Sequence, residues 1–167
     1  MPTVSVYLCV VNEIRLNFCD RSINLIDQSV RPSVSACLPV CRWQGDKDSR
    51  DMGLSTQYEQ NLVALIKQLR LQYNAPKAKF VTASLGQATM GSTGGAGLIL
   101  DAMMNVANAT KFPEFADNVA AVYTNPLLHT PGSSGGHYGD DAYTYMDVGE
   151  AMGKAMIQML KADEQQQ

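Results

Sequence analysis

Helical periodicity alternates with short apolar runs from about residue 42 to the end of the chain. The apolar runs at 80–84 and 119–123 have the length of buried strands, and helical patterns are expected at 56–73, 98–107 and 142–161. Strands separated by helices are typical of a parallel sheet with crossover connections. The sequence therefore predicts an α/β fold with a mostly parallel sheet, in which ligands bind beyond the carboxyl ends of the strands.

The clearest of these elements is the helix expected at 56–73. Thr56 and Glu59 have the spacing of a capping box, and Asn74-Ala75-Pro76 would end the helix. Its apolar positions share one face: Tyr58, Leu62, Leu65, Ile66 and Leu69. The final helix carries a similar stripe, formed by Val148, Met152, Ala155, Met156 and Met159. Both helices are expected to bury one side against the sheet.

The first 41 residues differ from the rest of the chain, because they contain all four cysteines and show no clear helical period. A strand is expected at 4–11, whereas the short apolar runs at 23–30 and 35–40 fit either a strand or a helix. Cys37 and Cys41 have neither a CxxC partner nor a nearby histidine. No zinc site, and no metal site of another kind, is therefore expected.

Composition excludes several classes of protein. The length of 167 residues suits one domain with one core. The net charge is −3 and the basic residues are scattered, which argues against nucleic acid as a partner. No apolar run approaches the roughly 20 residues that a transmembrane helix needs, so no membrane partner is expected. The N-terminus lacks the features of a signal peptide, and the cysteine usage favours a reducing compartment such as the cytoplasm.

Two polar turns, far apart in the sequence, contain the residues best suited to catalysis. His137 follows glycine residues that would let a substrate approach the backbone, and a histidine suits the role of general base. Gln44 carries two amide hydrogens for an oxyanion hole, and the backbone N–H of Gly45 would join it. Gly45, Asp46 and Gly136 are the candidate substrate-binding residues. Both turns also fit a structural role, as a plain strand-to-helix connection and as a helix cap.

The nucleophile is less clearly marked. Gly132-Ser133-Ser134-Gly135-Gly136 matches G-x-S-x-G, and Ser134 lies three residues before His137. A nucleophile elbow lies directly between a strand and a helix, whereas this motif lies within an expected loop. Ser84, at the end of an expected strand, is another candidate. The glycine-rich stretch at 91–97 would cradle an anion at the start of a helix, although it lacks the Lys-Ser/Thr ending of a P-loop.

Three other polar or aromatic residues fit structural roles better than chemical ones. Trp43 is the single tryptophan, and we expect it to pack rather than to bind a ligand. His129 follows Asn125-Pro126-Leu127-Leu128 and is also expected to be structural. Asp48, together with the preceding acidic residue of its turn, would orient the turn by accepting backbone hydrogen bonds.

Three stretches of the chain carry a family resemblance, which covers about residues 43–162. Trp43-Gln44-Gly45-Asp46-Lys47-Asp48 is similar to a W-Q-G-E-x-D block, with Asp46 in place of the glutamate. The second stretch runs from Tyr58-Glu59-Gln60-Asn61-Leu62 to Phe80-Val81, and the third joins Gly136-His137-Tyr138 to Tyr145-Met146-Asp147-Val148-Gly149. In these stretches the chain resembles the sialate O-acetylesterase-like group of the SGNH hydrolase superfamily, the sixth carbohydrate esterase family.

The resemblance implies a three-layer sandwich with the flavodoxin-like SGNH hydrolase fold, no metal or cofactor, and serine-based removal of acetyl groups from sugars. Gln44 would serve the oxyanion hole and His137 would be the general base. The family's G-x-S nucleophile block has no counterpart before Trp43, where Ser22 is the nearest substitute. Residues 1–41 are therefore expected to be a shortened or replaced N-terminal part, and a strand missing there would favour a homo-oligomer through an unpaired sheet edge.

We therefore expect a single domain over residues 1–167, with an esterase-like portion at 42–162 and a polar tail at 163–167. The expected function is that of a serine esterase acting on acetyl or other short acyl esters, such as acetylated saccharides. Its candidate catalytic residues are His137, Gln44, Ser134 and Ser22. The alternative is a non-catalytic carbohydrate-binding or scaffold protein that retains the hydrolase fold without the nucleophile. A phosphate-binding or phosphatase role for the glycine-rich stretch comes third.

Overall fold

A parallel sheet forms the centre of the molecule. Within residues 39–129 and 136–165, which the computed structural model describes, the sheet contains three strands. They are β1 (Val40–Trp43), β2 (Phe80–Ala83) and β3 (Val119–Val122), in that order across the sheet, and they pair in register along their whole length. The carboxyl ends of the three strands therefore lie at one edge of the sheet.

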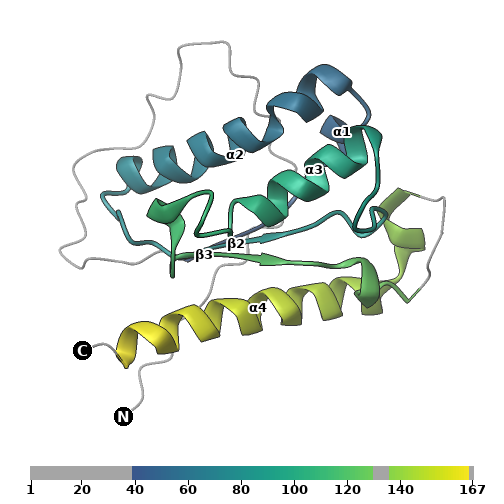
Figure 1. Cartoon of the computed structure of the whole chain (residues 1–167). Helices are drawn as coiled ribbons and strands as arrows, with labels where there is room; N and C mark the ends of the chain where they lie inside the picture. The colour runs from purple at the N-terminus through teal and green to yellow at the C-terminus, as the bar shows by residue number, and fades with distance from the viewer. Residues whose placement is uncertain (1–38, 130–135, 166–167) are drawn as a thin grey trace, which may run out of the picture.

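Helices cover both faces of this sheet and give the molecule three layers (Figure 1). α2 (Met52–Gln72) and α3 (Gly94–Asn105) lie on one face, and α4 (Ala142–Glu164) lies on the other. The shorter elements of the described part are α1 (Asp46–Ser49), η1 (Pro113–Phe115), η2 (Asn125–Leu127) and η3 (Gly136–Asp140). The predicted α/β fold with a parallel sheet is confirmed.

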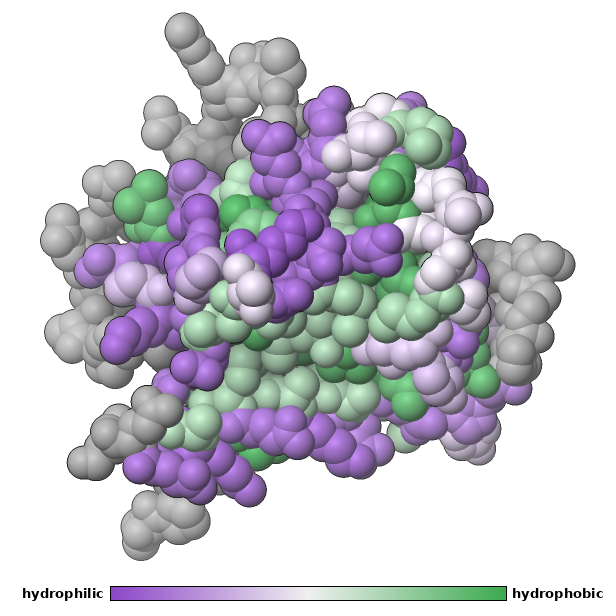
Figure 2. All heavy atoms as spheres, viewed as in Figure 1, coloured by the Kyte–Doolittle hydropathy of each residue, from purple (hydrophilic) through white to green (hydrophobic). Residues whose placement is uncertain are grey.

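Alternate residues of the strands build a separate core on each face of the sheet. Phe80 packs towards α2 and α3, whereas Val81 and Ala83 pack towards α4. The larger core contains Tyr58, Leu62, Ile66, Ile99, Met103, Val106 and Phe115. The core under α4 contains Val148, Met152, Met156 and Met159, as the apolar stripe of that helix predicts. In the space-filling view a band of apolar side chains lies between the hydrophilic outer surfaces of the two helix layers (Figure 2).

The start of α2 differs from the sequence prediction. The helix begins at Met52 rather than near Thr56, because Asp51 caps it by accepting hydrogen bonds from the backbone N–H groups of Gly53 (2.8 Å) and Leu54 (3.2 Å). The expected capping box does not form. The hydroxyl of Thr56 donates to the carbonyl oxygen of Met52 inside the helix (3.0 Å). Asp51 therefore sets the start of the helix, four residues before Thr56.

The other elements agree with the sequence more closely. The strands expected at 80–84 and 119–123 each end one residue earlier, and β3 is half-buried beyond its first residue rather than fully buried. α4 begins as predicted at Ala142, where Asp141 caps it, but continues to Glu164. α3 begins four residues earlier than predicted, inside the glycine-rich stretch. The expected strand at 4–11 and the run at 23–30 lie outside the described residues.

Candidate functional site

The turn that follows β1 brings the amide of Gln44 into a fixed orientation. Arg42 donates from Nη2 to the side-chain oxygen Oε1 of Gln44, and Gln44 donates from Nε2 to Oδ2 of Asp48 at 3.0 Å. Arg42 marks the oxygen end of the amide and Asp48 marks the nitrogen end. Because an amide nitrogen carries two hydrogens, one N–H remains after the bond to Asp48. The arrangement thus presents a held amide donor at the edge where parallel sheets bind ligands.

Tyr58 on α2 holds this turn through two hydrogen bonds. Its hydroxyl donates to the backbone carbonyl oxygen of Gln44 (2.7 Å) and accepts from Nη1 of Arg42 (3.2 Å). Burial raises the pKa of Tyr58 to about 12, against the opposing effect of the Arg42 guanidinium. The phenol is therefore neutral across the physiological range and remains a hydrogen-bond donor. The sequence marked Tyr58 as a core residue, and its polar role was missed because the contact with Gln44 spans two elements.

Gly45 is required by the backbone and by the packing around it. Its φ of 143° lies in a region that residues with a side chain rarely adopt. A Cβ atom here would lie 3.0 Å from Cγ2 of Ile99 and 3.0 Å from Cε of Met103. Gly45 is buried, so its structural role is evident, whereas the predicted contact of its backbone with a substrate stays a prediction.

Asp46 lies on the exposed side of the turn after β1 and contacts residues from other segments at this edge of the sheet. Its carboxylate accepts from Nη2 of Arg50 at 2.5 Å and from Nε2 of Gln87 at 2.9 Å. The oxygen Oε1 of the same Gln87 accepts from the hydroxyl of Tyr138 at 3.1 Å. Gln87 therefore bridges the turn after β1 to η3. Gln87 was not singled out from the sequence, since its partners lie 41 and 51 residues away in the chain.

Stacked aromatic rings fix η3 against the end of the sheet. The rings of Trp43 and Tyr138 stack with centroids 5.1 Å apart and an angle of 12° between the planes, and Tyr145 meets both at their edges. Nε1 of Trp43 donates to the carbonyl oxygen of Ser84 (2.9 Å), and the backbone N–H of Gly86 donates to the Tyr138 hydroxyl (3.1 Å). Burial raises the pKa of the Tyr138 phenol. Trp43 packs, as predicted.

The two polar turns of the sequence therefore meet in the structure. Trp43 directly precedes Gln44, and Tyr138 directly follows His137, so the stacked pair brings the two segments together. Gly136 and His137 form the start of η3. The side chain of His137 lies outside the described residues, as do Ser22 and Ser134 in full.

Ser84 lies at the end of β2 but serves the backbone. Its side chain is fully buried, and its Oγ accepts a hydrogen bond from the backbone N–H of Thr124 at 2.9 Å. The hydroxyl of Thr124 in turn donates to the carbonyl oxygen of Ser84 at 2.7 Å. This reciprocal pair ties the ends of β2 and β3 together. A substrate has no access to Oγ of Ser84 in this arrangement, which weighs against Ser84 as the nucleophile.

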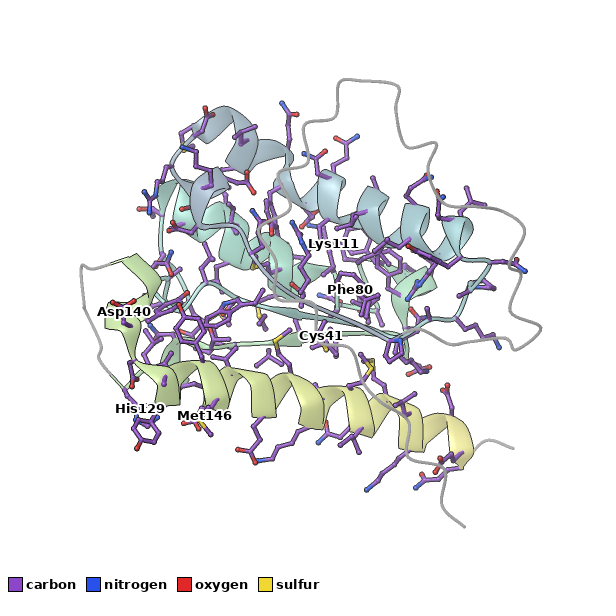
Figure 3. The ribbon with its side chains drawn as sticks, turned by 180° about the vertical axis from the view of Figure 1, so that it is seen from behind. Cys41, Phe80, Lys111, His129, Asp140 and Met146 are labelled. Carbon is purple, nitrogen blue, oxygen red and sulfur yellow. The ribbon has the colours of Figure 1, made fainter. Side chains whose placement is uncertain are left out.

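His129 lies apart from the Gln44 turn. It follows η2, and its Nε2 lies 2.8 Å from Oδ2 of Asp147 on α4. In Figure 3 His129 lies on the far side of α4 from the sheet, whereas Asp140 marks the end of η3 beside the strand ends. The hydrogen bond to Asp147 raises the pKa of His129. The contact joins η2 to α4, which agrees with the expected structural role.

Close backbone packing accounts for two glycines, Gly95 and Gly97, of the glycine-rich stretch at 91–97. A Cβ atom on Gly95 would lie 2.1 Å from the carbonyl oxygen of Ser49, and one on Gly97 would lie 1.9 Å from that of Ser92. Neither position has room for a side chain. These glycines therefore let the start of α3 approach α1 and its own preceding loop, which is sufficient reason for them without a bound phosphate.

Comparisons with known proteins identify no relative of this chain. No protein-family model, curated protein or solved structure matches the chain at a significant level. Within residues 39–129 and 136–165, no group of three or more His, Cys, Asp or Glu side chains is placed to hold a metal ion. In the same residues, no helix is long and apolar enough to cross a membrane.

Proposed function

We propose that the chain is a serine esterase of the SGNH type that removes acetyl or other short acyl groups, with acetylated saccharides as its substrate class. The observation that carries this proposal is the docking of η3 on the turn after β1 through Trp43 and Tyr138. It brings the segment of His137 to the segment of Gln44, as a general base and an oxyanion donor require. We also propose that the observed α/β architecture belongs to the flavodoxin-like SGNH hydrolase fold.

In the proposed reaction a serine hydroxyl attacks the acyl carbonyl carbon while His137 takes its proton. The carbonyl oxygen becomes an oxyanion that the remaining N–H of Gln44 stabilises. Collapse of this intermediate releases the sugar alcohol, which takes the proton from His137. Water then attacks the acyl-enzyme by the same route, and a carboxylic acid leaves. Ser134 and Ser22 are the candidates for the nucleophile.

The surroundings of Gln44 support this role. An oxyanion donor is effective when its orientation is set before the reaction, and Arg42 and Asp48 hold the two ends of the amide. The negative charge of Asp48 opposes a nearby oxyanion, and the guanidinium of Arg42 offsets it. In this proposal the exposed carboxylate of Asp46, together with the backbone of Gly45 and Gly136, contacts the alcohol part of the substrate.

The deciding experiment is labelling with a fluorophosphonate probe, followed by mapping of the modified residue by mass spectrometry. We expect one stoichiometric adduct, on Ser134 or Ser22, that is lost in His137→Ala. His129→Ala is the matched control, because it removes the other histidine of the chain and should label normally. With 4-nitrophenyl acetate, His137→Ala should lower kcat by about 10³-fold or more, and Gln44→Leu by about 10²-fold. A folded chain that forms no adduct would contradict the proposal.

A non-catalytic carbohydrate-binding protein is the second candidate. It is favoured by the hydrogen bonds that already occupy the site, since Asp46 is engaged by both Arg50 and Gln87. Ser84, the serine at the end of β2, is also inaccessible. Titration calorimetry with an acetylated saccharide separates the two functions. Heat of binding without release of acetate would identify a binding protein, whereas acetate release identifies the esterase.

A further inference from the structure

α4 carries a second set of apolar side chains on the side that faces away from the sheet. Tyr143 and Met146 are each 68% exposed, and Ile157 is 43% exposed. Figure 3 shows Met146 on the outer side of the helix. The stripe that packs on the sheet, from Val148 to Met159, lies on the opposite side. One apolar stripe is enough to hold a helix on a sheet, and the outer set is not part of that stripe. Within the described residues, the ring of Tyr143 instead lies against that of His129, with centroids 5.9 Å apart.

The outer set follows the spacing of a helix–helix seam. Tyr143, Met146, Glu150, Gly153 and Ile157 are separated by alternating intervals of three and four residues. This spacing keeps side chains on one line along an α-helix and is typical of helices that pack lengthwise against another helix. We call these five residues the outer seam.

Two glycines of α4, Gly153 in the outer seam and Gly149 near it, support the same interpretation. A Cβ atom added to Gly149 or to Gly153 would meet no atom within 4 Å. The fold of the single chain therefore does not need glycine there, although glycine inside a helix lowers its stability relative to alanine. Gly95 and Gly97 differ, because their own chain fills the space of the missing side chain. A second helix that approaches α4 closely would make use of the open space.

The positions of the charged residues on the outer side of α4 favour a second copy of this chain as the partner. Acidic Glu150 lies in the first half of the helix and basic Lys154 and Lys161 lie in the second half, all on the outer side. If a second α4 lies antiparallel, Glu150 faces Lys154 of the other copy and Met146 faces Ile157. Tyr143 then faces Lys161, and all these pairs are centred at the level of Met152. We propose that the outer seam is the interface of a two-fold symmetric dimer of this chain.

The dimer is expected to be weak. The seam with its flanking lysine spans residues 143–161, roughly 27 Å of helix at 1.5 Å per residue. One helix pair of this length buries less surface than the roughly 1,600 Å² of a standard stable interface. Association should therefore depend on protein concentration. In the single chain Glu150 and Lys154 pair with each other at 2.7 Å, and dimerisation would exchange these two internal contacts, one in each copy, for two contacts between the copies.

Sedimentation equilibrium over a range of concentrations tests the proposal with two charge reversals. Glu150→Lys places like charges opposite Lys154 of the partner, and Lys154→Glu does the same with opposite sign. Each variant alone should show a dissociation constant at least 10-fold higher than the unchanged chain. An equimolar mixture of the two should dimerise again, because every facing pair is then of opposite charge. A purely internal ion pair cannot produce this rescue by mixing.

Two further variants make the result decisive. Asp101→Lys changes a carboxylate to a lysine on the exposed side of α3, and it should leave dimerisation unchanged. Gly153→Leu fills the open space at the seam, where the Cβ atom itself meets no atom of its own chain within 4 Å, and it should abolish the dimer while circular dichroism shows an intact helix. A monomeric unchanged chain at the highest concentration, single reversals that dimerise normally, or a mixture that stays monomeric would each overturn the proposal.

Discussion

The two faces of the sheet are packed in different ways. On the side of α2 and α3, backbones approach so closely that Gly95 and Gly97 leave no room for a Cβ atom, and the core contains branched aliphatic and aromatic side chains. On the side of α4, a single helix packs mostly through methionines, and its glycines stand in open space. Flexible methionine side chains adapt to a changed neighbour, whereas close backbone contact does not. The first face should therefore be much less tolerant of substitution.

The sharpest test of this difference is a matched pair of glycine substitutions. In Gly97→Ala the new Cβ atom would lie 1.9 Å from the carbonyl oxygen of Ser92, so the backbone must move, and we expect a loss of at least about 4 kcal/mol in the free energy of unfolding. Gly149→Ala meets nothing and should gain about 0.5–1 kcal/mol from helix propensity. Urea unfolding measures both. Similar values for the two variants would remove the contrast between the faces.

Truncation of one buried side chain on each face should give the next largest difference. Leu62→Ala leaves a cavity between α2 and the sheet, and we expect a loss of about 3 kcal/mol. Met156→Ala should cost only about 2 kcal/mol, because Met152 and Met159 can move into the gap. The same unfolding experiment compares them, with crystal structures of both variants to measure the cavities. A larger loss for Met156→Ala would show that the methionine face is the more rigid one.

A buried polar atom on the side of α2 and α3 allows a test in which stability is expected to rise rather than fall. The hydroxyl of Thr82 is fully buried and has no hydrogen-bond partner among the described residues. Thr82→Val keeps the shape and removes the unsatisfied group, so we expect a gain of about 1 kcal/mol. Thr82→Ser keeps the hydroxyl and should destabilise instead. A loss of stability in Thr82→Val would indicate that a buried water molecule satisfies this hydroxyl.

The smallest expected effect is the pH dependence of the stability that the His129–Asp147 contact gives to the α4 side. The pKa of His129 is raised above its usual 6.5 by its hydrogen bond to Asp147. The contact therefore stabilises the folded chain fully below pH 6.5, and this contribution disappears as the pH rises through the folded pKa. Thermal unfolding of the unchanged chain and of Asp147→Asn should differ more at pH 5.5 than at pH 8.5. Because His129 is exposed, the difference should be small, and a difference that grows with pH would contradict this assignment.

The sequence predicted the elements better than the contacts between them. Helical spacing identified the buried side of α2 and of α4, because burial of one stripe follows directly from the period of the helix. The predicted start of α3 was wrong because glycines usually indicate a loop. Here the close approach of Gly95 to Ser49 and of Gly97 to Ser92 outweighs the low helix propensity of glycine. Local sequence carries no information about such an approach, since it depends on how α1 and α3 pack.

In the candidate site, too, local elements were easier to predict than the contacts between distant segments. The strand before Gln44 was left open, because the apolar run at 35–40 fitted either a strand or a helix. That the segment of His137 would lie at the carboxyl edge of the sheet could be predicted, because it follows a buried strand of a parallel sheet. The stack of Trp43 on Tyr138, the bridge through Gln87 and the support from Tyr58 could not. Each is a contact between distant segments whose geometry is set by strand register and helix docking. The roles of Ser22 and Ser134 stay predictions, since both lie outside the described residues.

The position of Trp43 gives the chain an optical property of practical use. It is the single tryptophan, it directly precedes Gln44, and its ring lies on that of Tyr138. All indole fluorescence of the protein therefore originates next to the candidate site. A ligand that enters the turn after β1, or that displaces η3, would change the intensity or the wavelength of this emission. Binding can thus be followed on the unlabelled chain, before any substrate is known.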